Sequence, residues 1–162
     1  LAILVHSPDP FSKFFVDDFE PSAQRFKFEP LVVRVAGVED LDHAFQEIAK
    51  RKAEALYVPN LSFFTSHRSQ IIERALKARL PLLSNQNAIS EAGGLLSYGT
   101  PHEEYYRRTA GLVDKILRGA KPADMPVEQP ERFELIVNMK TAKAIGITLS
   151  PTTMLRADKV IQ

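Results

Sequence analysis

Short polar side chains gather in three loops, and each loop follows a run of apolar residues. The loops span residues 7–11, 60–63 and 84–87. Serine, asparagine and glutamine both donate and accept hydrogen bonds, and Phe11, Phe63 or Phe64 could supply an apolar wall. This chemistry suits a neutral or zwitterionic small molecule. The same residue types also serve turns and helix caps, so that second interpretation stays open for each residue taken singly.

Signatures of catalysis and of metal binding are missing from the sequence. No glycine pattern has the spacing of a phosphate-binding loop, and no nucleophile elbow is present. There is no cysteine, and the four histidines are scattered at His6, His43, His67 and His102. His6 alone ends an apolar run on the expected ligand side. Asp9 is the only acid in the three loops, and its position before Pro10 favours a turn role. We therefore expect a non-enzymatic protein without cofactor, catalytic residue or metal.

Composition limits the classes of partner. The 162 residues suffice for one globular domain, and the formal charge of +1 is made of interspersed charges. Neither nucleic acid nor an anionic membrane is expected as a partner. No apolar run approaches the ~20 residues that span a bilayer. The sequence opens within an apparent strand, which predicts an excerpt whose export signal, and a whole preceding domain, could lie upstream of residue 1.

Apolar runs alternate with helical patterns through the first half of the chain. Strands are expected over residues 1–5, 31–35, 55–59 and 81–83, separated by helices over 11–26, 41–48 and about 71–79. Pro21 should kink or split the first helix, and Asp40 is a plausible N-cap of the second. This alternation predicts an α/β fold with a doubly wound, mainly parallel sheet and helices on both faces. Ligands bind such sheets outside the carboxyl ends of the strands, so the three polar loops should share one rim.

The stretch 91–99 separates this regular half from a different organisation, and we expect it to form a hinge strand beside the ligand. Thr100, Pro101 and Glu103 have the spacing of a capping box, which predicts a helix that begins there and ends at Gly119. Three prolines should then hold residues 121–131 extended. A strand over 133–137, a short helix over 141–145 that ends at Gly146, and a last helix over 150–161 that is capped by Ser150 and Pro151 complete the prediction.

Four ordered motifs resemble one known family. They are Glu-Ala-Gly-Gly-Leu-Leu-Ser-Tyr-Gly at 91–99, Tyr-Arg-Arg at 106–108, and the longer runs 113–130 and 133–146. In these stretches the chain resembles the substrate-binding proteins of ABC transporters, in the family that includes bacterial tryptophan- and tyrosine-binding proteins. The likeness is dense over residues 81–162 and looser, but collinear, from residue 1.

The resemblance implies a type I periplasmic binding protein fold, in which two lobes joined at a hinge close over a solute and hand it to a membrane permease. This chain would be the C-terminal half of such a periplasmic protein. Residues 1–96 would form a ligand-binding lobe, residues 97–131 the hinge crossings plus a helix belonging with the first lobe, and residues 132–162 the rest of the lobe. The hinge residues would be Ser97, Tyr98, Gly99, Val127, Glu128, Gln129 and Pro130.

The resemblance also implies ligand contacts in the three loops, at Ser7, Pro8, Asp9, Asn60, Leu61, Ser62, Asn85 and Gln86. Amino-acid binders that resemble this chain tend to carry acids in the second and third loops, where Leu61 and Gln86 stand here. A neutral or anionic solute, including an aromatic one, is therefore as plausible as an amino acid.

Two alternatives to transport stay open: a ligand-sensing regulatory domain of the same fold, and an enzyme of a flavodoxin-like fold. A further expectation concerns the helix over residues 101–118. If the first lobe is absent, this helix should pack either on the sheet of the lobe described here or on a partner chain, and a second copy of the chain as the partner would give a homodimer. The reason is that the apolar side of the helix is costly to leave in water.

Overall fold

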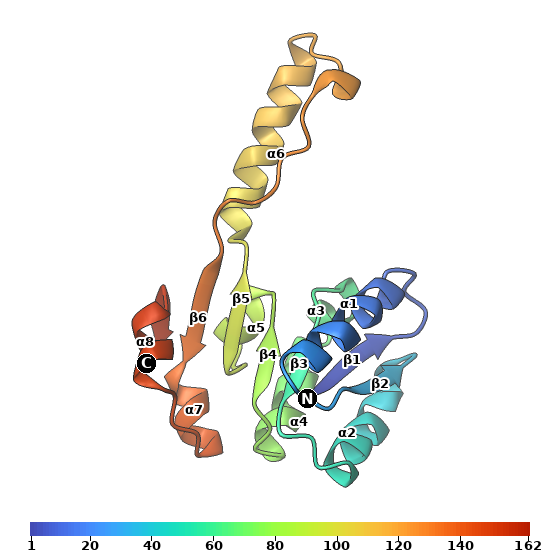
Figure 1. The fold of residues 1–162 in the computed structure, drawn as a ribbon, viewed down its shortest axis with the longest axis vertical. Helices are drawn as coiled ribbons and strands as arrows, with labels where there is room; N and C mark the ends of the chain where they lie inside the picture. The colour runs from blue at the N-terminus through green and yellow to red at the C-terminus, as the bar shows by residue number, and fades with distance from the viewer.

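A seven-stranded sheet runs through the computed structural model, which describes the backbone of residues 1–162 and every side chain except that of His102. The order of the strands is β2-β1-β3-β4-β5-β6-β7 (Figure 1). All neighbouring strands pair in parallel apart from β5 and β6, which are antiparallel. The strands are β1 (Ala2–His6), β2 (Leu31–Val35), β3 (Leu56–Val58), β4 (Leu82–Ser84), β5 (Leu96–Gly99), β6 (Glu134–Asn138) and β7 (Lys159–Ile161).

Helices surround this sheet. They are α1 (Ser12–Arg25), α2 (Leu41–Lys50), α3 (Ser62–Ser66), α4 (Arg68–Lys77), α5 (Asn87–Glu91), α6 (His102–Leu117), α7 (Met139–Ile145) and α8 (Pro151–Arg156), with 3-10 turns η1 (Val38–Asp40) and η2 (Pro122–Asp124). Ala2 and Leu4 share a core cluster with the apolar sides of α2 and α4. Ile3 and Val5 point to the opposite face of β1 and are also buried, so both faces are covered. The predicted α/β doubly wound sheet is confirmed.

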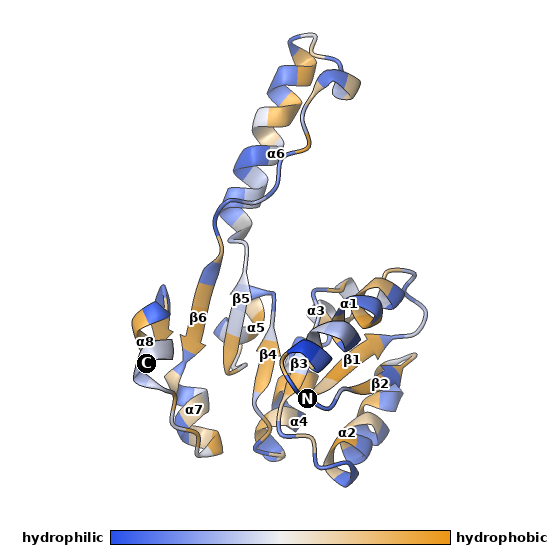
Figure 2. Ribbon diagram, in the orientation of Figure 1, coloured by the Kyte–Doolittle hydropathy of each residue, from blue (hydrophilic) through white to orange (hydrophobic). Residues whose placement is uncertain are grey.

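One part of the chain stands apart from the sheet. We call residues 100–133 the arm; it contains α6, η2 and the extended segment that returns to β6, and Figure 1 shows it projecting beyond the strands. None of the described side chains of α6 is buried, and Figure 2 shows hydrophobic residues scattered along it. The prediction that this helix packs on the lobe's own sheet is wrong, because extended geometry at Pro101 (φ −58°, ψ 135°) carries the chain straight out of β5. Packing against a partner chain stays a prediction.

Several predicted boundaries also need correction. Thr100 is not the N-cap of α6: Pro101 takes that position, without a side-chain capping hydrogen bond. The last helix does not run to residue 161, because α8 ends at Arg156 and β7 follows, pairing with β6. The first helix continues through Pro21 without being split. The predicted caps at Gly146, in the left-handed region at φ 77°, and at Ser150 are confirmed.

Candidate functional site

The three polar loops meet at one rim of the sheet, as predicted. Strands β1, β3 and β4 run parallel, so the loops that follow them emerge at the same edge. Two hydrogen bonds join the second loop and the helix α3, which begins within it, to the third loop. The backbone N–H of Asn60 donates to Asn85 Oδ1 at 2.9 Å, and the hydroxyl of Thr65 donates to Gln86 Oε1 at 3.1 Å. The rim is thus one connected structure.

The end of β1, directly before the first loop, is joined to the second loop by stacked rings. The imidazole of His6 lies flat on Phe63, with centroids 4.1 Å apart and planes 3° from parallel. Farther along, the backbone N–H of Phe11 donates to Asp9 Oδ1 at 2.8 Å, which fixes the Asp9 carboxylate in a turn. Ser7 and Pro8 are exposed beside it. The turn role favoured for Asp9 is therefore present, and it leaves the second carboxylate oxygen available.

The predicted ligand residues differ in how accessible they are. Ser7, Pro8, Asn60 and Ser62 are exposed, and Asp9 and Asn85 are half-buried. Leu61 and Gln86 are buried, at 7% exposure each. Leu61 belongs to the core cluster, and the Gln86 amide oxygen is engaged by Thr65 from α3. These two residues shape the rim more than they present polar groups at it.

A hollow of about 500 Å³ lies between this rim and the base of the arm. We call it the arm-side hollow. Asn60 and Asn85 line it from the loops, and Gly99, Thr100 and Pro130 line it from the base of the arm. Four aromatic rings complete the lining: Tyr98, Tyr105, Tyr106 and Phe133. The rings of Tyr98 and Phe133 stack with centroids 5.5 Å apart. The sequence interpretation missed Tyr105, Tyr106 and Phe133 as site residues, although a tyrosine pair so soon after the predicted hinge strand was a usable signal.

A second hollow, of about 560 Å³, adjoins the first at Asn60. We call it the α1-side hollow. Its other lining residues are Asp9, Phe11, Phe14, Phe15, Leu61 and Ser62. The side chains of Phe11 and Phe14 are each 63% exposed. Both hollows have volumes within the range of ~300–1,000 Å³ that small-molecule sites occupy.

Two of the predicted hinge segments lie in different surroundings. In β5, Ser97 is buried and its hydroxyl donates to Asn87 Oδ1 at 3.4 Å, while Tyr98 is exposed. Gly99 lies so close to the third loop that a Cβ there would stand 2.9 Å from the carbonyl carbon of Asn85 and closer still to its oxygen. A side chain at residue 99 is thereby excluded unless this loop moves.

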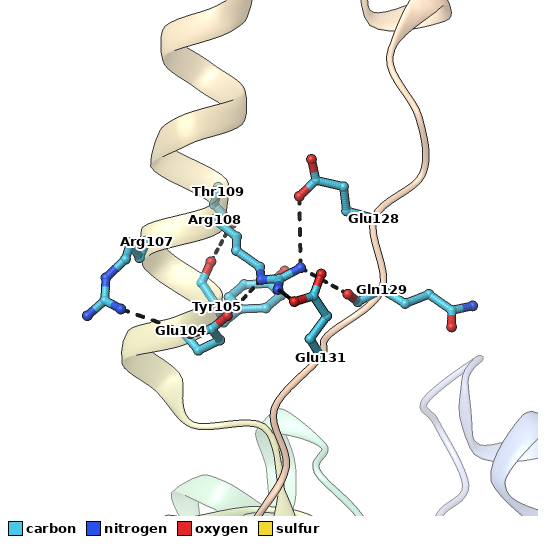
Figure 3. Close-up of polar contacts among 8 residues, drawn as sticks. All are labelled: Glu104, Tyr105, Arg107, Arg108, Thr109, Glu128, Gln129 and Glu131. Atoms are coloured by element: carbon cyan, nitrogen blue, oxygen red, sulfur yellow. Dashed lines mark hydrogen bonds and ion pairs between the residues drawn. The ribbon is translucent and has the colours of Figure 1, made fainter.

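Residues 127–130, the other predicted hinge segment, run alongside α6 (Figure 3). Arg108 holds them: its Nη1 donates to the Gln129 carbonyl at 3.0 Å and lies 3.9 Å from Glu128. Its Nε also donates to Glu104 at 2.8 Å, and its Nη2 lies 3.2 Å from Glu131. The hydrogen bond from Arg108 lowers the pKa of Glu104, and the hydrogen bond to Glu104 raises the pKa of Arg108. We call this cluster the Arg108 clamp.

Among the described side chains, no group of three or more histidine, cysteine or acidic residues could hold a metal ion. Within the same part of the chain, no helix has both the length and the apolar character that crossing a membrane requires.

Comparison with known proteins identifies relatives. The family model described as ABC transporter substrate binding protein matches residues 2–161. A curated relative is the tyrosine-binding protein of Clostridioides difficile, 21% identical over 147 residues that make up 91% of this chain and 42% of that protein. The chain therefore spans less than half the length of this relative.

Solved structures share the fold. A conserved domain protein from Vibrio cholerae matches 98% of this chain and 53% of its own, with a TM-score of 0.90 at 21% identity. The ABC domain in complex with L-Trp from Streptococcus pneumonia matches 99% of this chain and 54% of its own, with a TM-score of 0.89 at 24% identity. A ligand-free, open substrate-binding protein with adhesive properties from Clostridium difficile gives a TM-score of 0.75 at 22% identity, over 99% of this chain and 54% of its own.

Proposed function

Because this chain belongs to the family of ABC transporter substrate-binding proteins, we propose that it forms one half of a solute-binding protein. Such a protein holds a small molecule in a cleft and delivers it to the permease of an ABC importer on the outer side of the membrane. The observation that carries the proposal is the convergence of three polar loops and the base of the arm on two adjoining hollows. The role is binding without catalysis.

The exposed arm suggests which segments of the chain belong to which lobe. Residues 1–96 and 132–162 build the lobe with the rim, and residues 97–131 lead to and from a second lobe. The arm supports this division because it exposes large apolar side chains, among them Val113, Leu117 and Val127. Exposed apolar patches mark interaction surfaces. We propose that these side chains dock on the other lobe of the whole protein.

Capture of the solute depends on closure. A ligand favours the closed state only to the extent that it gains contacts there. Asp9, Asn60, Leu61, Ser62 and Asn85 line the two hollows and are the proposed contacts from the rim. Ser7, Pro8 and Gln86 line neither hollow, and their contact with a solute stays a prediction. The tyrosines of α6 contribute from the arm, so the arm-side hollow has one wall on the lobe and one on the arm. Closure is proposed to bring these two walls together around the solute. The ligand is proposed to contact both walls in the closed state and fewer groups in the open state, and this difference is the proposed source of the free energy that favours closure.

The solute is proposed to be a small organic molecule with a planar ring. Four aromatic side chains line the arm-side hollow, and rings pack on rings with a preference worth ~0.5–1.5 kcal/mol beyond area burial. Similar proteins are described as tyrosine-binding and as a complex with L-Trp, which is in keeping with a ring-bearing solute.

Asn60 provides the test, because it lines both hollows. The full-length protein that contains this chain would be screened by thermal shift against amino acids, aromatic acids, aromatic amines and small sugars. A ligand at 100 times its Kd stabilises the folded state by about 2.7 kcal/mol. Asn60→Ala should then weaken the binding of any hit in calorimetry, whereas Gln70→Ala, an exposed amide on α4, should not. Absence of hits, or equal affinity in the Asn60→Ala protein, contradicts the proposal.

A further inference from the structure

The two hollows carry an unbalanced charge. Of all the side chains that line them, only that of Asp9 is formally charged, and neither Lys nor Arg contributes to either wall. The remaining polar groups are the neutral amides and hydroxyls of the rim and the arm. A bound molecule therefore meets one carboxylate, several aromatic rings and no cation from this half of the cleft.

The Asp9 carboxylate is held in place at the edge of the α1-side hollow. Its Oδ1 accepts the backbone N–H of Phe11 at 2.8 Å, and among the described contacts its other oxygen has no hydrogen-bond donor. The residue is half-buried, which reduces screening by solvent. A carboxylate in this position prefers a charged donor, since charge-assisted hydrogen bonds are roughly twice as strong as neutral ones.

The rings next to Asp9 suit the same kind of group. Phe11 directly precedes α1, and Phe14 lies in the first turn of that helix. Their ring centroids are 6.3 Å apart. Each is 63% exposed, so ring surface is open to the hollow and to solvent. The face of an aromatic ring attracts cations through its quadrupole. Phe15 also lines the hollow, which makes three rings beside one carboxylate.

From this juxtaposition we propose that the α1-side hollow binds the ammonium group of an organic cation, with Asp9 as its ionic partner and the phenylalanines around its alkyl part. The inference rests on the proposed solute-binding function and names the class of solute. The planar part of the same molecule extends past Asn60 into the arm-side hollow. An anionic solute is disfavoured because its charge would face Asp9 with no compensating cation on this half of the cleft.

A charge series on one ring system tests the proposal. Tryptamine, indole, tryptophan and indole-3-acetate share the indole ring and are cationic, neutral, zwitterionic and anionic at neutral pH. Calorimetry on the full-length protein should give the tightest binding for tryptamine, by roughly tenfold or more over indole-3-acetate, the size expected of one charge-assisted hydrogen bond. The preference should shrink as salt is raised, because a partly exposed ion pair is screened.

Variants assign the preference to Asp9. Asp9→Asn keeps an oxygen that can accept the Phe11 N–H, so the turn survives while the charge is lost, and it should bring tryptamine down to the affinity of indole. Asp17→Asn, which removes an exposed acid farther along α1, is the matched control and should leave the series unchanged.

Three outcomes overturn the assignment: tighter binding of indole-3-acetate or tryptophan than of tryptamine, an unchanged tryptamine affinity in Asp9→Asn, or no binding by any of the four compounds. The solute-binding function fails separately, when the wider thermal-shift screen finds no ligand. Binding of indole that is lost in Asn60→Ala, together with indifference to Asp9→Asn, would keep the function and reject the ammonium site.

Discussion

Gly99 is the position where a single methyl group should do the most damage to the rim. It ends β5 directly against the third loop, and an added Cβ would lie 2.9 Å from the Asn85 carbonyl carbon, nearer than real side chains approach. In Gly99→Ala the loop has to shift, and overpacking of this kind costs about 1–3 kcal/mol. For a chain of 162 residues that lowers Tm by roughly 2–12 °C. Because Asn85 accepts the Asn60 N–H, ligand affinity should fall as well.

Urea unfolding followed by circular dichroism at 222 nm measures the effect. The same substitution at Gly111, on α6, is the control, since nothing lies within 4 Å of a Cβ built there. Alanine is favoured over glycine in a helix interior by about 1 kcal/mol, so Gly111→Ala should raise helicity rather than lower stability. If Gly99→Ala unfolds at the wild-type urea concentration, the close contact with the third loop does not constrain the rim and the reasoning is refuted.

Three further perturbations test other parts of the structure. Arg108→Ala should release residues 126–131 from α6 and speed their amide exchange, and high salt should act in the same direction on the wild-type protein, because exposed ion pairs are screened. Asn138→Ala should cost roughly 1–3 kcal/mol in urea unfolding, since its buried side chain caps α7 and donates to the Ser90 carbonyl. Burial raises the pKa of Tyr57 from 10.0 to about 12, so the free energy of unfolding should fall as pH rises from 10 to 12, and Tyr57→Phe should remove that slope.

Each of these three substitutions has a matched control substitution elsewhere in the chain. Arg118 pairs with Asp114 inside α6, so Arg118→Ala should leave exchange in residues 126–131 unaltered. Ser150 makes a similar cap in an exposed position, and Ser150→Ala should cost less than Asn138→Ala because water reaches the freed N–H. Tyr98 is exposed, so Tyr98→Phe should keep the alkaline slope. Equal effects within any pair would contradict the structural explanation of that pair.

Local sequence signals were sufficient to predict the structure of a segment where one kind of interaction determines it. The run at residues 1–5 reads as a strand because both of its faces are buried, and a strand covered on both faces has no polar alternation. The shared rim followed from parallel pairing, which places loops after successive strands at one edge. Caps at Gly146 and Ser150 were predictable because backbone conformation and hydroxyl chemistry act within a few residues.

Tertiary contacts decided what the sequence left unclear. Three residues of β7 pair only with β6 at the edge of the sheet, too short a segment for period-2 alternation to appear. Helical periodicity identified α6 but not its direction, which is set by the extended backbone at Pro101. Gln86 looked available for a ligand, yet the hydroxyl of Thr65, a residue 21 positions away, engages its amide oxygen. Tyr105 and Phe133 reach one hollow only because β5 and β6 lie side by side.

The antiparallel pairing of β5 with β6 attaches the arm by two adjacent strands instead of one. Four facing residue pairs, from Leu96 and Val137 to Gly99 and Glu134, would have to shear before the arm could swivel about its own length. The arm can then only bend beyond the last of these pairs, Gly99 and Glu134, about an axis that runs across both strands. Tyr98 moves with the sheet and Tyr105 with the arm, so the distance between these two rings reports how far the arm has bent relative to the sheet.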